Sequence, residues 1–193
     1  MPRVKNFDEK EVLEKAMGLF WVQGYHATSI QDLVDHLGIN SASLYDTYGG
    51  KESLFQKAFR RYREQNTAQL RQFFIGQPEV RKGLRALFAS AIAEAVQDTD
   101  RKGCFVVNTV TELVPGDPEL LQVLRENNRN FEHLFFEYLK GGEDSGQIPK
   151  GKDLRAIASL LFTLYNGLKV VSKVSAGQDQ HLASIDSLLK LLD

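Results

Sequence analysis

The chain has 193 residues, a hydrophobic content of 42% and a formal net charge of −1 at pH 7. This apolar content is enough to build a core, which excludes global disorder, and the length suits a small head joined to a larger body. The charge does not indicate a nucleic-acid partner, since the residues up to Gln65 carry as many basic as acidic side chains.

The cysteine count and the apolar runs indicate the compartment. A single cysteine excludes an internal disulfide framework. The first ten residues contain no apolar run of the kind found in a signal peptide, and the longest uncharged apolar stretch, residues 156–168, falls short of the roughly 20 residues of a membrane span. We therefore expect a cytoplasmic protein without a membrane partner. Neither a metal-spaced cluster nor a phosphate loop suggests a metal or a cofactor.

The first helix is expected over residues 8–23. Val12, Ala16 and Phe20 give it an apolar stripe, and Gly24 ends it. We interpret this helix as a brace for the two short helices that follow.

Residues 28–51 predict two short helices joined by a tight turn. Thr28 is the expected N-cap of the first, with Gln31 completing a capping box, and Gly38 supplies its left-handed end. Asn40 is the expected cap of the second helix. Two short helices at a fixed angle are what a helix-turn-helix needs to place its second helix in a major groove.

The second of these helices, residues 41–48, is expected to expose small side chains, most of them hydroxyls, and one aromatic ring. Such side chains can approach base edges and phosphates without filling the groove. They are Ser41, Ala42, Ser43, Tyr45 and Thr47. The alternative is a helical hairpin on the surface with no role in DNA binding.

The rest of the chain is also helical in pattern. A long helix over residues 50–75 leaves the head and enters the body, and from Pro78 onward the apolar spacing stays close to 3.6. We expect a short helix after Gly103, a helix ending near Leu139, a loop over residues 141–151 and two further helices over residues 153–175 and 179–192. The chain is thus predicted to be all-α.

The helix over residues 153–175 is apolar nearly all round, so it needs cover on two sides. One side can pack on its own body and the other on a second copy, as in a twofold four-helix interface. The alternative is a buried central helix in a monomer. The residues assigned to the dimer interface are Leu160, Leu164, Val171, Leu182, Ile185 and Leu189.

The region from about Phe7 to Phe59 resembles the DNA-binding domain of the TetR/AcrR family of transcriptional regulators. The residues that carry the resemblance include Ala16, Leu19, Phe20, Gly24, Tyr25, Thr28, Ile30, Leu33, Gly38, Ile39, Ser43, Leu44, Tyr45, Tyr48, Lys51, Glu52, Leu54 and Phe55. The sequence departs from the family pattern at Asp46 and at Gly49-Gly50.

This resemblance implies a helix-turn-helix domain over residues 1–52 and a helical ligand-binding and dimerisation domain over 53–193. It implies phosphate contacts by Thr28, Ser43, Tyr48 and Lys51. Ser41, Ala42 and Tyr45 are the candidates for base contacts, and Ser29 completes the candidate DNA-binding set. The partner would be double-stranded operator DNA with a pseudo-palindromic sequence, bound by a homodimer.

The resemblance also implies an inducer pocket in the aromatic-rich body. The polar Asn127 interrupts an apolar stripe there, and a buried amide needs a partner, which a ligand could supply. The candidate pocket residues are Phe88, Cys104, Phe105, Asn108, Asn127, Phe131, Phe162, Tyr165 and Asn166. The alternative is that the aromatic residues form a plain core and that the amides cap neighbouring helices.

Cys104 follows Arg101, Lys102 and Gly103 at the start of a predicted helix. Cationic neighbours and a helix N-terminus both stabilise a thiolate, so oxidant or electrophile sensing is a hypothesis. The alternative is a small buried residue.

The leading functional hypothesis is a homodimeric repressor that leaves its operator when a small-molecule inducer binds or when Cys104 is modified. A helical interaction adaptor without DNA binding is one alternative, favoured by the neutral head. An enzyme with Cys104 as nucleophile is another, although no motif brings a histidine base to that thiol. We therefore expect a protein that is not an enzyme.

Overall fold

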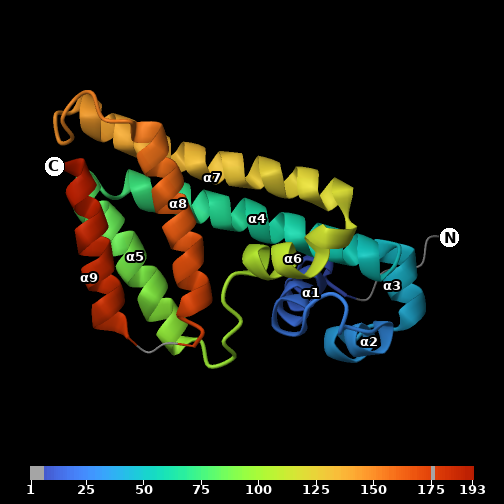
Figure 1. Cartoon of the computed structure of the whole chain (residues 1–193). Helices are drawn as coiled ribbons and strands as arrows, with labels where there is room; N and C mark the ends of the chain where they lie inside the picture. The colour runs from blue at the N-terminus through green and yellow to red at the C-terminus, as the bar shows by residue number, and fades with distance from the viewer. Residues whose placement is uncertain (1–6, 175–176) are drawn as a thin grey trace.

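The computed structural model describes residues 7–174 and 177–193, and over these residues the chain forms helices joined by turns and loops (Figure 1). The α-helices are α1 (Glu9–Gln23), α2 (Ile30–Leu37), α3 (Ser41–Tyr48), α4 (Lys51–Ile75), α5 (Val80–Gln97), α6 (Phe105–Leu113), α7 (Pro118–Asp144), α8 (Leu154–Val171) and α9 (Gln178–Leu189). Two short 3-10 turns, η1 (Val114–Gly116) and η2 (Lys190–Leu192), follow α6 and α9. The all-α prediction is confirmed.

Helices α1, α2 and α3 form a head at one end of the molecule (Figure 1). Helix α4 runs from this head into the body alongside α7, while α5, α8 and α9 gather at the opposite end. Helix α6 lies close to α1, between the head and the rest of the body. The long α4 therefore connects the two ends mechanically, as the sequence suggested.

Two apolar clusters hold these parts together. The body cluster contains buried residues from the second half of α4 and from α5, α7, α8 and α9. The head cluster includes Phe20, Leu33 and Leu44, and it also takes in Phe105 from α6 and Leu124 from α7. Because the body supplies part of the head's core, a shift of α6 or α7 changes the packing of the head. The domain boundary after residue 52 stays a prediction.

Helix α7 continues past the expected stop near Leu139 and ends at Asp144. The expected loop at Gly141 and Gly142 is therefore wrong at its start. A Cβ atom at Gly142 would lie 2.7 Å from Val80 Cγ2 and 3.1 Å from Ile148 Cδ1. The glycine is thus needed for close packing inside a helix and does not end it.

Helix α8 packs against α5 and α7 and buries Leu161 and Leu168. It is long and apolar enough, by length and composition, to cross a membrane, but the core helix of a soluble protein meets the same criteria. Helix α8 ends at Val171, earlier than expected, and Ser175, where we expected its end, lies outside the described residues.

The residues assigned to the dimer interface fall into two groups. Leu160 is 44% exposed and Val171 42% exposed, and Leu164 and Leu182 are half-buried. Ile185 and Leu189 are fully buried within the chain's own body cluster, because α9 turns its apolar stripe toward α5. The assignment of Ile185 and Leu189 to an intermolecular surface is therefore wrong.

Candidate nucleic-acid interface and the cavity behind the head

The turn between α2 and α3 is fixed by residues that the sequence identified. Gly38 adopts the left-handed conformation (φ 68°, ψ 28°) that ends α2. The Asn40 side chain then accepts a hydrogen bond from the Ser43 backbone N–H at 2.8 Å and caps α3. Ile39 and Leu44, on either side of this cap, are both buried in the head cluster, which holds the two helices at one angle.

The N-cap of α2 is Ser29, and the expectation of Thr28 with Gln31 is wrong. The Ser29 hydroxyl accepts from the Asp32 N–H at 3.0 Å, while the Asp32 carboxylate accepts from the Ser29 N–H at 2.8 Å. The Ser29 hydrogen bonds lower the pKa of Asp32. Thr28 is fully buried and donates its hydroxyl to the Gly24 carbonyl at 2.6 Å, so its side chain points back toward α1 and does not cap α2.

Helix α3 presents one exposed face to solvent. Ser41, Ala42, Tyr45 and Asp46 are exposed, with Tyr45 at 53%, and Ser43 is half-buried. Leu44 and Tyr48 on the opposite side are buried and anchor the helix. The candidate base-reading residues therefore share a face that the head leaves uncovered.

Gly49 and Gly50, where the sequence departs from the family pattern, form the turn from α3 into α4. Both have positive φ, 84° and 115°. A Cβ atom at Gly50 would lie 3.2 Å from Cε1 of Tyr45. The pair therefore allows a sharp turn and gives the Tyr45 ring room to lie against the backbone.

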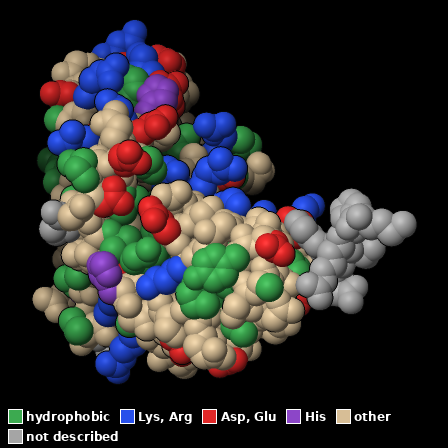
Figure 2. All heavy atoms as spheres, turned by 90° about the vertical axis from the view of Figure 1, so that its right-hand side faces the viewer, with side chains coloured by type: hydrophobic (Ala, Val, Ile, Leu, Met, Phe, Trp, Pro, Cys, Tyr) green, Lys and Arg blue, Asp and Glu red, His purple; other side chains and the backbone are tan. Residues whose placement is uncertain are grey.

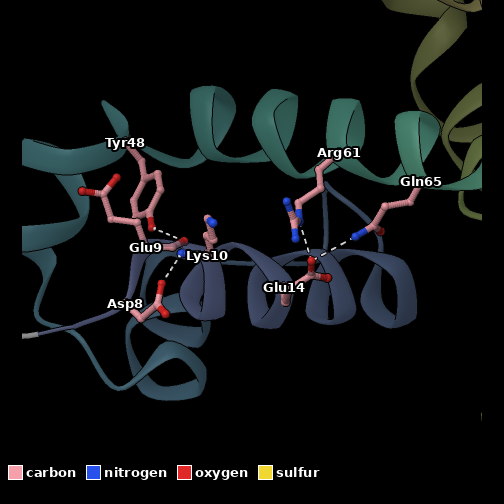
Figure 3. Close-up of polar contacts among 7 residues, drawn as sticks. All are labelled: Asp8, Glu9, Lys10, Glu14, Tyr48, Arg61 and Gln65. Carbon is pink, nitrogen blue, oxygen red and sulfur yellow. Dashed lines mark hydrogen bonds and ion pairs between the residues drawn. The ribbon is translucent and has the colours of Figure 1, made fainter. Parts of the chain in front are cut away.

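The phosphate candidates differ in what they can offer. The Tyr48 side chain is buried and donates its hydroxyl to the Glu9 carbonyl at 3.1 Å, and burial raises its pKa to about 12 (Figure 3). Thr28 and Tyr48 therefore use their hydroxyls inside the protein, contrary to the expected phosphate contacts. The Lys51 ammonium lies 4.3 Å from the centre of the Tyr25 ring at the start of α4. It forms no ion pair with a described carboxylate.

The end of the molecule that carries the head shows mixed chemistry (Figure 2). Lysine and arginine side chains are scattered there among acidic, apolar and neutral polar groups, without one continuous basic patch. This agrees with the charge balance of the sequence. The face therefore offers a nucleic acid a few placed groups and backbone amides, and not a continuous positive surface.

Two carboxylates tie the head to the rest of the chain. Glu14 of α1 accepts hydrogen bonds from Arg61 Nε and from Gln65 Nε2 of α4, the latter at 3.0 Å (Figure 3). Glu112 of α6 accepts from the backbone N–H groups of Tyr25 and His26 at 3.0 and 2.6 Å. Since both contacts join α1 or its following turn to helices of the body, they fix the orientation of the head.

A cavity of about 520 Å³ lies behind the head, between α1, α4, α5 and α8. Its volume falls within the range of small-molecule sites. Its walls combine aromatic rings with amide and charged side chains. The lining includes Met17, Trp21, Tyr62, Gln65, Asn66, Gln69, Phe73, Ser90, Glu94, Asp98, Lys102, Tyr165 and Lys169.

Of the residues expected in the pocket, only Tyr165 lines this cavity. Phe88, Phe131 and Phe162 belong to the body cluster. Cys104 and Phe105 belong to the head cluster. These five are core residues, as expected for aromatic and small apolar side chains at helical spacing.

The amides expected in the pocket are used elsewhere. Asn108 donates to the Lys102 carbonyl at 2.8 Å and accepts from Lys173 at 2.9 Å. Asn166 donates to the Phe162 carbonyl at 3.1 Å. Asn127 is buried on α7 away from the cavity. The structure therefore moves the candidate ligand site toward the head.

One feature of the sequence could have indicated the residues that line the cavity. Gln65, Asn66 and Gln69 interrupt the apolar face of α4 between Tyr62 and Leu70. An amide cluster within an apolar stripe is equally consistent with a polar cavity and with a face exposed to solvent. Trp21 packs against the head cluster and also lines the cavity, where it donates its indole N–H to the Gly103 carbonyl at 3.1 Å.

Cys104 is 4% exposed and lies beside this cavity, next to the lining residue Gly103. The Tyr62 hydroxyl is its hydrogen-bonding neighbour, with 3.9 Å between the oxygen and Sγ. Burial raises the pKa of Tyr62, so its hydroxyl stays a donor at neutral pH. Within the described part of the chain, no group of three His, Cys, Asp or Glu side chains could hold a metal ion.

A capped helix-turn-helix with an exposed second helix, joined by a long helix to a cavity-bearing helical body, defines a class of DNA-binding transcriptional regulators. The comparisons identify the family within that class. The family model "Bacterial regulatory proteins, tetR family" matches residues 12–58, and "Tetracyclin repressor-like, C-terminal domain" matches residues 81–185. The chain belongs to the TetR family of bacterial regulators.

Relatives and solved structures agree with this assignment. The chain is 34% identical to the uncharacterised HTH-type transcriptional regulator YezE of Bacillus subtilis, with 100% of both chains covered. It is 31% identical to the HTH-type transcriptional repressor ComR of Escherichia coli, covering 98% of this chain and 90% of the relative. A cysteine variant of the TetR-family regulator CifR, solved with 26-base-pair operator DNA, has a TM-score of 0.83 at 28% identity and covers 99% of this chain and 100% of its own.

Proposed function

We propose that the chain is a homodimeric repressor that binds a pseudo-palindromic operator through α3. The observation that carries this proposal is the exposed face of Ser41, Ala42 and Tyr45 on a helix whose other side is locked into the head cluster. The relative ComR is a repressor and the CifR variant was solved with operator DNA, which supports the same activity here. Such a protein acts in the cytoplasm, where the DNA is.

The exposed stripe of α8 supports the homodimer. Leu160 and Val171 are exposed, Leu164 is half-buried beside them, and Gly167 between them has open space where a side chain would stand. These residues recur at three- and four-residue spacing, so they share one helix face. A second copy of α8 packed on this face brings two heads to successive major grooves, about 34–36 Å apart.

The cavity is the proposed inducer site. Gln65 lines the cavity and also donates a hydrogen bond to Glu14 of the head. A ligand that accepts the hydrogen bond of this amide in place of Glu14 removes one of the two contacts between α4 and Glu14. The orientation of the head then depends on the remaining contacts of Glu14 and Glu112. A coupling free energy of about 1–3 kcal/mol between ligand binding and DNA binding is enough to change the DNA affinity measurably.

Modification of Cys104 is the second proposed signal. A maleimide adds the thiol across its C=C bond: the C–S bond forms, the C=C π bond is lost and the thiol proton ends on the neighbouring carbon. The adduct adds volume between α4 and α6, where the residue is 4% exposed. Overpacking at this joint moves α6 and with it the Glu112 contact to the head.

Alkylation by N-ethylmaleimide is expected to lower the affinity for operator DNA by about 5- to 150-fold. The Cys104→Ser variant, which has no thiol because the chain has a single cysteine, is expected to keep its affinity. DNA binding by fluorescence anisotropy, with mass spectrometry to count adducts, measures both. Release of the Cys104→Ser variant by the same reagent, or full labelling of the wild type without release, would refute the thiol signal.

The two alternatives have weaker support. An adaptor would bind DNA weakly and without salt dependence. A Cys104-dependent enzyme needs a general base, and the hydrogen-bonding neighbour of the thiol is the Tyr62 hydroxyl, which donates to the sulfur. Binding to DNA from upstream of the protein's own gene, followed by anisotropy over a salt series, separates the regulator from the adaptor.

A further inference from the structure

The cavity contains two lysine ammonium groups without acidic partners. Lys169 Nζ lies 4.3 Å from the centre of the Tyr165 ring, and Lys102 Nζ lies 5.2 Å from the centre of the Trp21 ring. Among the ion pairs of the described residues, neither lysine has a carboxylate within 4.0 Å. Each ammonium has three N–H donors, so the cavity wall retains unused donor capacity.

The acids on the same wall are already engaged. Glu94 accepts a hydrogen bond from the Ser90 hydroxyl at 3.0 Å, and Asp98 accepts from the Gly103 N–H at 3.0 Å. The charge of Glu94 also acts on Lys169 without forming an ion pair. Each carboxylate thus has a neutral donor, whereas neither ammonium has an ion pair among the described residues, and a ligand carboxylate can supply that partner.

Lys169 keeps its charge in this half-buried position. Burial alone lowers the pKa of its ammonium, but the ionisable neighbours Tyr165 and Cys104 raise that pKa above the ordinary value. A charge that is held away from bulk water interacts more strongly with an anion than a charge on the open surface does.

The remaining walls suit a flat or ring-bearing body. Trp21, Tyr62 and Phe73 line the cavity, and the edge-to-face contact of Trp21 with Tyr62, at 4.9 Å between ring centres, fixes two of these rings. Gln65, Asn66 and Gln69 add neutral donors and acceptors along α4. A volume of about 520 Å³ accommodates two such rings together with a small polar group.

We propose that the cavity binds small aromatic carboxylates, with the carboxylate paired to Lys169 and Lys102 and the rings against Trp21 and Tyr62. This inference rests on the proposed function for its regulatory consequence, since it names the chemical class of the inducer. The binding itself follows from the cavity.

The test uses the full-length protein and three probes of one shape. These are diphenylacetate, its neutral amide diphenylacetamide and the cationic diphenylethylammonium. Trp21 is the single tryptophan of the chain and stands on the cavity wall, so its fluorescence reports occupancy of this site. Diphenylacetate is expected to bind about 10-fold more tightly than the amide, because only the acid forms charge-assisted hydrogen bonds. The cation is expected to bind more weakly than both.

Variants at one position separate charge from folding. Lys169→Met is expected to weaken diphenylacetate about 10-fold and to leave the amide within about 2-fold, while Lys169→Arg keeps most of the preference. Lys190→Met, an exposed lysine outside the cavity, is the matched control and is expected to change neither. Tightest binding by the ammonium probe, equal binding of acid and amide, no response of Trp21 to any probe, or an unchanged preference in Lys169→Met would each overturn the proposal.

DNA binding by anisotropy on the same samples shows whether the proposed ligand class or the proposed regulatory function has failed. Preferential binding of diphenylacetate without any loss of DNA affinity supports the ligand class and refutes the inducer role of the cavity. Salt-dependent DNA binding together with no preference for the acid overturns the ligand class and leaves the DNA-binding function intact.

Discussion

Replacing both Leu160 and Val171 by glutamate will give a folded monomer whose affinity for operator DNA is lower by about 100-fold or more. Both side chains are more than two-fifths exposed, so glutamate is solvated at these positions when no second chain covers them. In a dimer the same four carboxylates would be buried against each other in an apolar interface, which the assembly cannot tolerate. Loss of the dimer removes the high effective concentration of the second head on its half-site, hence the large effect on DNA.

Two measurements and one control variant check this prediction. Light scattering is expected to give twice 21.8 kDa for the wild type and 21.8 kDa for the double variant. Circular dichroism is expected to show unchanged helix content. The matched control Leu160→Met with Val171→Ile keeps apolar side chains at both positions and is expected to stay dimeric. A double glutamate variant that remains a dimer would place the interface on another surface.

Replacing Tyr45 by alanine will lower affinity for the operator by about 10- to 100-fold, which corresponds to about 1–3 kcal/mol for a base contact. The ring stands 53% exposed on α3, and its edge lies against Gly50, so it is held in place before DNA arrives. Truncation to alanine removes this ring without leaving a buried hole. The head is therefore expected to keep its stability while it loses DNA affinity.

Salt dependence and a matched control separate this loss from weaker phosphate binding. The Tyr45 side chain supplies no cation to a phosphate, so the slope of log affinity against log salt is expected to stay the same in Tyr45→Ala. In Lys51→Met that slope is expected to fall by about one. Val22→Ala removes another exposed side chain of the head, 54% exposed on α1, and is expected to change neither affinity nor slope. Equal losses on operator and random DNA would show that Tyr45 does not read sequence.

The head could be predicted well from sequence because its signals are local. Gly38 and Asn40 act on backbone groups within four residues, and apolar spacing fixes which face of α3 is buried. The cap of α2 was wrong by one residue, since Ser29 and Thr28 are both good caps. Ser29 is the cap because the Thr28 hydroxyl donates its hydrogen bond to the Gly24 carbonyl. That contact depends on the turn after α1, whose geometry the sequence pattern does not encode.

The body could be predicted in its class but not in its packing. Whether Gly142 ends a helix or permits close packing depends on Val80, more than sixty residues away in the chain. Ile185 and Leu189 have the composition of either a core or an interface, and only the docking of α9 on α5 decides between them. The cavity forms where four helices diverge, so it follows from long-range geometry and not from the local enrichment in aromatic residues.

The most direct test of the central claim is binding of the purified protein to labelled DNA from upstream of its own gene, measured by anisotropy from low to physiological salt. We expect tight binding of two chains per operator, with an affinity that falls steeply as salt rises and is reduced in Tyr45→Ala. Binding that is weak, indifferent to salt and equal for wild type and Tyr45→Ala would contradict the assignment of α3 as the DNA-reading helix.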